Sequence, residues 1–239
     1  MSKTSWTHNI VGRNIGLWRS IHGYGAAHLV NGRLLLCGYD IALHLWRDAK
    51  YDGIVEANGI PFRVEIKSTG LNKDPGEDDN AQFTFTSGGR SGKQIDRTAA
   101  SREKVISTSD VDFAIGVNSH NSNLWIIPAE IFQIIGATIK LNFAGKLFHE
   151  KVGIFLGVAG KFTSLEIKNG FSHFTEEELT EICNERNITI SNRLCKDTFD
   201  HQWKKSRNRN TLEISRKNSL ILDIWEFIYA NSDPKEIYK

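Results

Sequence analysis

The sequence predicts an α/β fold in which one helix precedes a group of strands, with an extension at the C-terminal end. Three observations indicate this order. Apolar residues recur at helical spacing across residues 23–38. Two alternating segments, 51–57 and 60–69, flank an Asn-Gly pair, the favoured loop of a tight hairpin. Two further apolar runs, at 111–117 and 124–127, are typical of strands.

The first elements precede the hairpin. Residues 1–22 carry apolar side chains without a clean period, which predicts a helical or irregular arm laid on the core. The helix at 23–38 ends at Gly38, a natural C-terminal stop. A strand at 41–46 then leads into the two hairpin strands.

The middle of the chain alternates loops with strands. Residues 70–92 are rich in Gly, Asp, Asn and Ser and predict a loop, apart from a short alternating segment at 82–86. A basic, partly helical segment follows at 90–104. The strands at 111–117 and 124–127 are expected to pair through the turn between them, and a short helix is expected at 131–135.

Beyond about residue 140 the pattern changes. Short alternating runs occur at 152–156 and 162–167. A helix is expected from Thr175, because Thr175 and Glu178 have the spacing of a capping box. An amphipathic helix is expected near the C-terminus, at 220–229. We therefore divide the chain into an arm (1–22), a core (23–139) and a C-terminal region (140–239) that is a candidate DNA-recognition or dimerisation subdomain.

Composition excludes several classes of protein. The 239 residues fit one large domain, or a core with a small appendage, and the formal net charge is only +2. Any nucleic-acid surface must therefore come from local clustering of basic residues. The polar N-terminus and the lack of a long apolar run favour a cytoplasmic protein without a membrane span. Three cysteines without paired spacing indicate reduced thiols, and a zinc site at Cys183, Cys195, His173 and His201 lacks the usual ligand spacing.

The hairpin brings three reactive side chains together. If the turn is centred on Asn58-Gly59, paired residues have numbers that sum to 117, so Asp52 faces Glu65. Like charges that face each other across two strands are destabilising, and a divalent cation would neutralise them. Lys67 is two residues from Glu65 and points to the same side.

Alternation along the hairpin supports this register, because it divides the side chains between an apolar face and a polar face. The apolar face carries Tyr51, Val55, Phe62, Val64 and Ile66, and the polar face Asp52, Arg63, Glu65 and Lys67. The alternative interpretation is an ordinary surface hairpin with alternating charges. Glu56, near the turn, and Asp110 and Asp112, at a strand end, are interpreted as structural.

This order of elements, with D-x12-E-x-K on the hairpin, resembles the PD-(D/E)xK nuclease superfamily. The resemblance covers roughly residues 23–135 and rests on the segments 38–53, 63–69, 94–96, 110–114 and 124–128. It implies a restriction-endonuclease-like core, with a central mixed β-sheet flanked by helices. It does not cover the arm or the C-terminal hundred residues.

The resemblance also implies roles for individual residues. Asp52 and Glu65 would bind the metal, with the main-chain carbonyl of Ile66 as an extra ligand. Lys67 would orient or deprotonate the attacking water, and Gln94 is a further catalytic candidate near the metal water. The implied cofactor is Mg²⁺, for which Mn²⁺ can substitute, and Mg²⁺ prefers such oxygen ligands.

Two positions depart from the superfamily. Many relatives carry a glutamate on the first helix, whereas residues 23–28 include no carboxylate. His28 is a candidate substitute acting through water, the alternative being an ordinary helix residue. Tyr51 stands where the signature has proline.

The expected function is that of a hydrolase, a metal-dependent deoxyribonuclease, and most specifically a type II-like restriction endonuclease. A structure-selective, homing or repair nuclease, such as a junction resolvase, shares the same trio. A non-catalytic DNA-binding module is the third alternative. We expect a homodimer on double-stranded DNA, because each chain has one active site and the two DNA strands to be cut are antiparallel. The expected DNA contacts are Arg90, Lys93, Arg97, Lys204, Lys205, Arg207 and Arg209.

Overall fold

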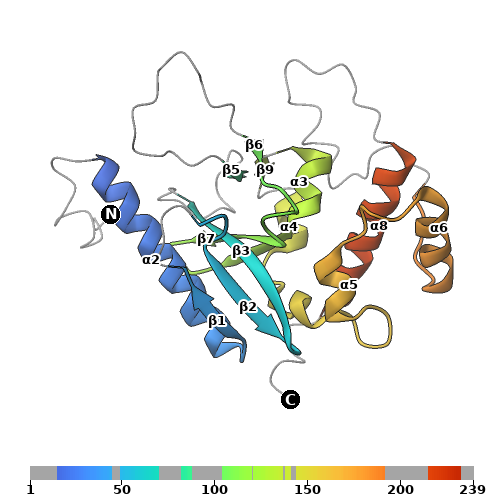
Figure 1. The fold of residues 1–239 in the computed structure, drawn as a ribbon, viewed down its shortest axis with the longest axis horizontal. Helices are drawn as coiled ribbons and strands as arrows, with labels where there is room; N and C mark the ends of the chain where they lie inside the picture. Colours follow the sequence, from blue (N-terminus) through green and yellow to red (C-terminus); the bar gives the residue numbers. More distant parts are fainter. Residues whose placement is uncertain are drawn as a thin grey trace, which may run out of the picture.

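The computed structural model describes residues 15–44, 49–69, 82–87, 104–119, 121–136, 138–140, 144–191 and 215–232. Its fold is mixed α+β, with a five-stranded mixed sheet in the order β1-β2-β3-β7-β8 and helices around it (Figure 1). Two smaller sheets pair β4 with β9 and β5 with β6. The predicted fold class is therefore confirmed.

The strands of the main sheet are β1 (Asp40–Leu43), β2 (Gly53–Ala57), β3 (Ile60–Thr69), β7 (Phe113–Asn118) and β8 (Leu124–Pro128). The short strands are β4 (Gln82–Thr84), β5 (Thr86–Ser87), β6 (Lys104–Val105) and β9 (Thr138–Lys140). The helices are α2 (Ile15–Leu36), α3 (Ala129–Ile135), α4 (Ala144–Phe148), the 3-10 helix η1 (Val152–Leu156), α5 (Ser164–Asn169), α6 (Glu176–Glu185) and α8 (Arg216–Asn231).

The β2–β3 hairpin has the predicted register. Asn58 and Gly59 both have positive φ angles, 52° and 74°, as the turn that suits a two-residue hairpin requires. Gly53 pairs with Val64 and Ala57 with Ile60, so the partners sum to 117. The alternation is also confirmed, because Val55, Phe62, Val64 and Ile66 are buried, whereas Arg63, Glu65 and Lys67 are only partly buried.

Strand β3 joins the two halves of the sheet. It is antiparallel to β2 and parallel to β7, with Lys67 beside Gly116 and Thr69 beside Asn118. Strands β7 and β8 form the predicted antiparallel pair, closed by a hydrogen bond from the Asn118 N–H to the Asn123 carbonyl at 3.0 Å. The C-terminal ends of β3 and β7 therefore lie at the same end of the sheet.

Helix α2 is longer than predicted, because it begins at Ile15 instead of Gly23. Glycines at 23 and 25 do not end it, because the helix is anchored by packing of Ala26, Val30 and Leu34 into the core. It runs antiparallel to β3: its N-terminal half contacts Ser68, and its C-terminal end leads through Tyr39 into β1. In Figure 1 it lies along the side of the sheet formed by β1–β3.

The two alternating runs after residue 140 are largely helical. Residues 152–156 form η1, and α5 occupies much of the second run. Helix α5 begins with a capping box between Thr163 and Glu166, a local signal that outweighs a short alternation. The predicted capping box at Thr175 and Glu178 is confirmed at the start of α6.

Helix α8 contains the predicted C-terminal helix but is buried on more sides than an amphipathic helix would be. Every residue from 219 to 225 is buried, which is typical of a helix inside a core. Trp225 packs edge-on against Phe113 of β7, and the Tyr229 hydroxyl donates to the Ile126 carbonyl at 2.5 Å. The buried core is thus continuous across residue 140.

Two further observations concern the cysteines and the helices. Cys37 and Cys183 are both buried in the hydrophobic core. In the part of the chain that the structure describes, no helix combines the length and the apolar character that crossing a membrane requires.

Candidate functional site

Asp52, Glu65 and Lys67 meet where β2 ends beside β3. The β2–β3 ladder stops at Gly53, and the Asp52 N–H donates to the Val64 carbonyl at 2.8 Å. The Asp52 carboxylate then accepts a hydrogen bond from the Ile66 N–H at 2.7 Å. The Lys67 ammonium donates to the Glu65 carboxylate. The three predicted residues are therefore brought together.

Glu65 is electrostatically unfavourable in this position. Its side chain is only 15% exposed, and burial raises the pKa of its carboxyl group. The negative charge of Asp52 raises this pKa further, and the adjacent Lys67 ammonium offsets part of the increase. The repulsion between Asp52 and Glu65 that the register predicted is thus a property of the folded protein.

A small divalent cation fits this pair of carboxylates. The Ile66 N–H points at Asp52, and the carbonyl of the same residue in a strand points to the same side. That side of β3 is where β2 has already ended. Two carboxylates and one carbonyl are hard oxygen donors, and Mg²⁺ completes such a set with water. Within the described ranges, no cluster of three or more His, Cys, Asp or Glu side chains offers a metal site.

Several predicted residues lie outside the described residues. These are Gln94, Arg90, Lys93, Arg97, Lys204, Lys205, Arg207 and Arg209. Their roles stay predictions. Two other residues of the sequence analysis are described: the candidate His28 is exposed on α2, and Glu56, interpreted as structural, is exposed on β2.

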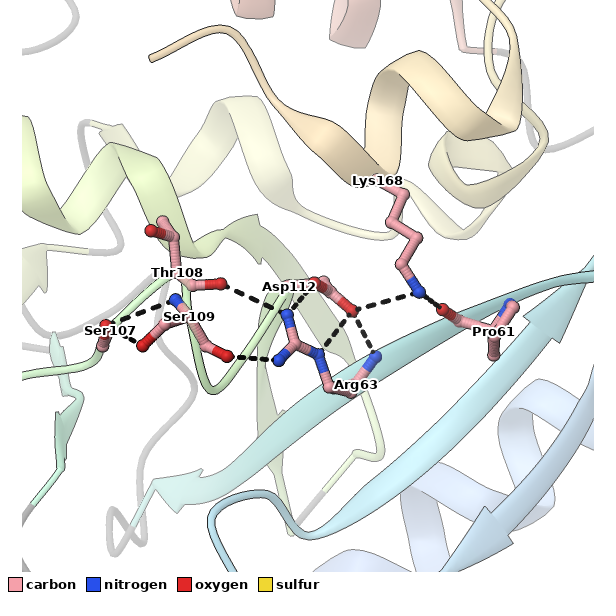
Figure 2. A network of polar contacts seen from close by, with 7 residues as sticks. All are labelled: Pro61, Arg63, Ser107, Thr108, Ser109, Asp112 and Lys168. Atoms are coloured by element: carbon pink, nitrogen blue, oxygen red, sulfur yellow. Dashed lines mark hydrogen bonds and ion pairs between the residues drawn. The ribbon is translucent and has the colours of Figure 1, made fainter. Parts of the chain in front are cut away.

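Arg63, on the polar face of β3, is part of a structural network (Figure 2). Its guanidinium and its N–H both donate to Asp112, at 2.6 Å from Nη2 and 2.7 Å from the backbone nitrogen. It also donates to the carbonyls of Thr108 and Ser109. Lys168 of α5 donates to the Pro61 carbonyl and lies 3.9 Å from the Asp112 carboxylate. Asp112 immediately precedes β7.

This network fixes β3 against the turn that leads into β7. The Asp112 side chain is 4% exposed, so the two cations compensate a buried charge. Asp110 makes an exposed ion pair with Lys50 at 2.8 Å. Both aspartates are thus structural, as the sequence interpretation held.

Glu130 is a buried carboxylate that the sequence analysis did not single out. It accepts hydrogen bonds from the N–H groups of Phe171 and Ser172, at 2.9 and 3.0 Å, and from the Trp225 indole. Burial raises the pKa of its carboxyl group. A Cβ atom at Gly170 would lie 2.8 Å from this carboxylate, so the glycine permits the close approach. Glu130 therefore links α3, the segment before α6, and α8.

His22 is the second residue that the sequence analysis missed. Its ring nitrogens contact the hydroxyl groups of Ser68 and Ser119, each at 3.0 Å. The local sequence of α2 gave no sign of this, because both serines are distant in the chain.

Comparisons with known proteins give little that bears on function. No protein-family model matches the chain, and no curated protein matches it. Among solved structures, a bacterial homing endonuclease is similar, with 19% sequence identity and a TM-score of 0.36 over 50% of this chain and 72% of that one. A likeness of this size assigns no function.

Proposed function

We propose that this protein is a Mg²⁺-dependent DNA endonuclease that hydrolyses phosphodiester bonds, and within that class a sequence-specific restriction enzyme. The observation that carries the proposal is the convergence of Asp52, Glu65 and Lys67 at one end of the sheet. Repelling carboxylates beside an ammonium group are costly for a fold, and they suit a site that binds a cation and a phosphate.

Each residue has a distinct role in the proposed reaction. Asp52 and Glu65 would hold the cation, and the Ile66 carbonyl is a candidate third ligand. Bound Mg²⁺ would acidify a water molecule and neutralise charge that develops on the phosphate. The Ile66 N–H fixes the orientation of Asp52. Lys67 would orient the attacking water or, as the neutral amine, accept its proton, and its contact with Glu65 supports such a role.

The proposed substrate is double-stranded DNA, cut by a homodimer with one site per chain. A two-fold dimer matches two antiparallel strands. Within this proposal, the basic residues of the segments 90–104 and 196–217 supply phosphate contacts. A junction resolvase or another structure-selective nuclease would use the same trio on a different DNA shape.

Digestion of a supercoiled plasmid with Mg²⁺, and in parallel with EDTA, tests the proposal. Discrete bands that require Mg²⁺ are the expected result. A smear would indicate nonspecific cleavage instead of cleavage at a specific sequence. Cutting of branched DNA alone would favour the structure-selective class. Absence of cleavage on every DNA substrate, with Mg²⁺ or Mn²⁺, would overturn the proposed function. The variant Glu56→Ala, which changes an exposed residue of β2, is the matched control and should cut like the wild type.

A further inference from the structure

In the part of β3 that carries the candidate site, only one edge of the strand is paired with a neighbouring strand. Beyond Val64, β2 has ended, so in the described structure residues 65–69 have ladder partners on β7 alone. On the open side, the Asp52 carboxylate bonds the Ile66 N–H. Because catalytic groups must be held to within about 0.5 Å, such a strand end needs additional restraints.

His22 supplies a restraint of this kind. One ring nitrogen contacts Ser68, the residue that follows Lys67 on β3, and the other contacts Ser119, the residue that follows β7. A single imidazole from α2 thus bridges the C-terminal ends of the two parallel strands. Ser68 and Lys67 are neighbours on β3 and point to opposite faces, so the contact of His22 with Ser68 lies on the face opposite Glu65 and Lys67.

A neutral imidazole can make both hydrogen bonds of this bridge. Burial lowers the pKa of His22, which keeps the ring uncharged at neutral pH. A neutral imidazole has one N–H donor and one acceptor nitrogen, and a serine hydroxyl can donate or accept. Either tautomer therefore satisfies both contacts, with one serine as donor and the other as acceptor.

We propose that His22 is a positioning residue for the phosphodiester cleavage proposed above, acting through Ser68 and Ser119 to fix the strand end that presents Glu65 and Lys67. The inference rests on the proposed function. It assigns α2 a role in the site through a histidine that bonds two strand ends, without contact to DNA, metal or the attacking water. Tyr24, two residues along the same helix, has an exposed side chain and is not part of the bridge.

The test compares His22→Ala and His22→Gln with the wild type, and uses Tyr24→Ala, at an exposed position of the same helix, as the matched control. In His22→Ala, the kcat for DNA cleavage should fall about 10- to 100-fold, because a small misplacement of catalytic groups is costly. KM should stay within about twofold, since His22 does not touch the DNA. His22→Gln keeps one donor and one acceptor and should recover most of the rate. Tyr24→Ala should cleave at the wild-type rate.

A second measurement does not depend on cleavage. Amide hydrogen exchange of residues 65–69 should become faster in His22→Ala and remain slow in His22→Gln and Tyr24→Ala. If the wild type cuts no DNA, the proposed function fails, and the exchange data still decide whether the bridge restrains the strand. A His22→Ala protein with unchanged kcat overturns the inference, and so does unchanged exchange in residues 65–69. If His22→Ala does not fold, His22→Gln and Ser68→Ala provide the same two readouts.

Discussion

Two glutamates in this molecule are both largely buried, and both have a raised pKa, but their surroundings differ. Glu130 accepts hydrogen bonds from two backbone N–H groups and one indole N–H, all supplied by the fold. Glu65 lies beside a second carboxylate, and its compensating partner is the flexible ammonium of Lys67. The folded chain satisfies Glu130 and leaves Glu65 in conflict with Asp52.

The difference separates a structural carboxylate from a functional candidate. Burial alone does not do so, because it raises the pKa of both groups. What distinguishes them is the set of neighbours around each carboxylate. Neutral N–H donors of the fold surround Glu130, whereas Glu65 lies near a second negative charge, that of Asp52. The predictions below test this separation, from the largest expected effect to the smallest.

Replacement of Lys67 by alanine should reduce DNA cleavage about 10³-fold, close to 4 kcal/mol in the activation barrier. DNA affinity should change little, because Lys67 serves the chemistry. Mg²⁺ binding should be as tight or tighter, since a positive charge next to Glu65 is removed. Single-turnover cleavage and a filter-binding assay measure the two effects. A Lys67→Ala enzyme that cuts at the wild-type rate would exclude the proposed mechanism.

Replacement of Glu130 by alanine should destabilise the fold by about 3 kcal/mol, because it leaves buried N–H groups of Phe171, Ser172 and Trp225 without their acceptor. Chemical denaturation measures this loss. Glu56→Ala, on the exposed side of β2, is the control and should change stability by less than about 0.5 kcal/mol. Equal stabilities of the two variants would contradict the structural role of Glu130.

Replacement of Asp112 by asparagine should cost about 2 kcal/mol of stability, because Arg63 and Lys168 lose the buried charge that they share. The backbone N–H of Arg63 keeps an acceptor, so the loss is partial. Asp110→Asn, in the same turn, removes only an exposed ion pair and should leave the unfolding midpoint unchanged. An Asp112→Asn variant as stable as the wild type would contradict the claim that this network stabilises the position of β3.

Replacement of Glu65 by glutamine should have the smallest effect on stability, and its sign should be favourable at neutral pH. A carboxyl group with a raised pKa in the folded state costs stability as pH rises from its ordinary value of 4.5 through the raised value. The advantage of Glu65→Gln should therefore be absent at low pH and grow across that window. Glu130 titrates in both proteins, so its contribution cancels. An advantage that shrinks as pH rises would contradict the raised pKa of the Glu65 carboxyl group.

Local sequence signals predicted the hairpin correctly. Asn58-Gly59 fixes the turn, and the turn fixes the register that puts Asp52 near Glu65. The exact geometry differs, since the ladder ends at Gly53 and the Asp52 carboxylate bonds the Ile66 N–H. A capping box also predicted α6, and Thr163 and Glu166 carry the same local signal at the start of α5.

The residues that sequence reasoning missed depend on distant partners. Glu130 looks like an ordinary acidic residue in the first turn of a helix, and its partners at 171, 172 and 225 come from the far part of the chain. The contacts of His22 could not be predicted from local sequence either, because Ser68 and Ser119 come close together only when β3 and β7 pair in parallel. Residues whose roles arise from non-local packing carry no local pattern.

Calorimetric titration with Mg²⁺ of the wild-type protein and the Asp52→Asn/Glu65→Gln double variant, without DNA, tests the central claim most directly. The account predicts measurable binding to the wild type that increases with pH, because protons compete for Glu65, and loss of that binding in the double variant. Equal Mg²⁺ binding by the two proteins would contradict the account, because the cation would then bind elsewhere.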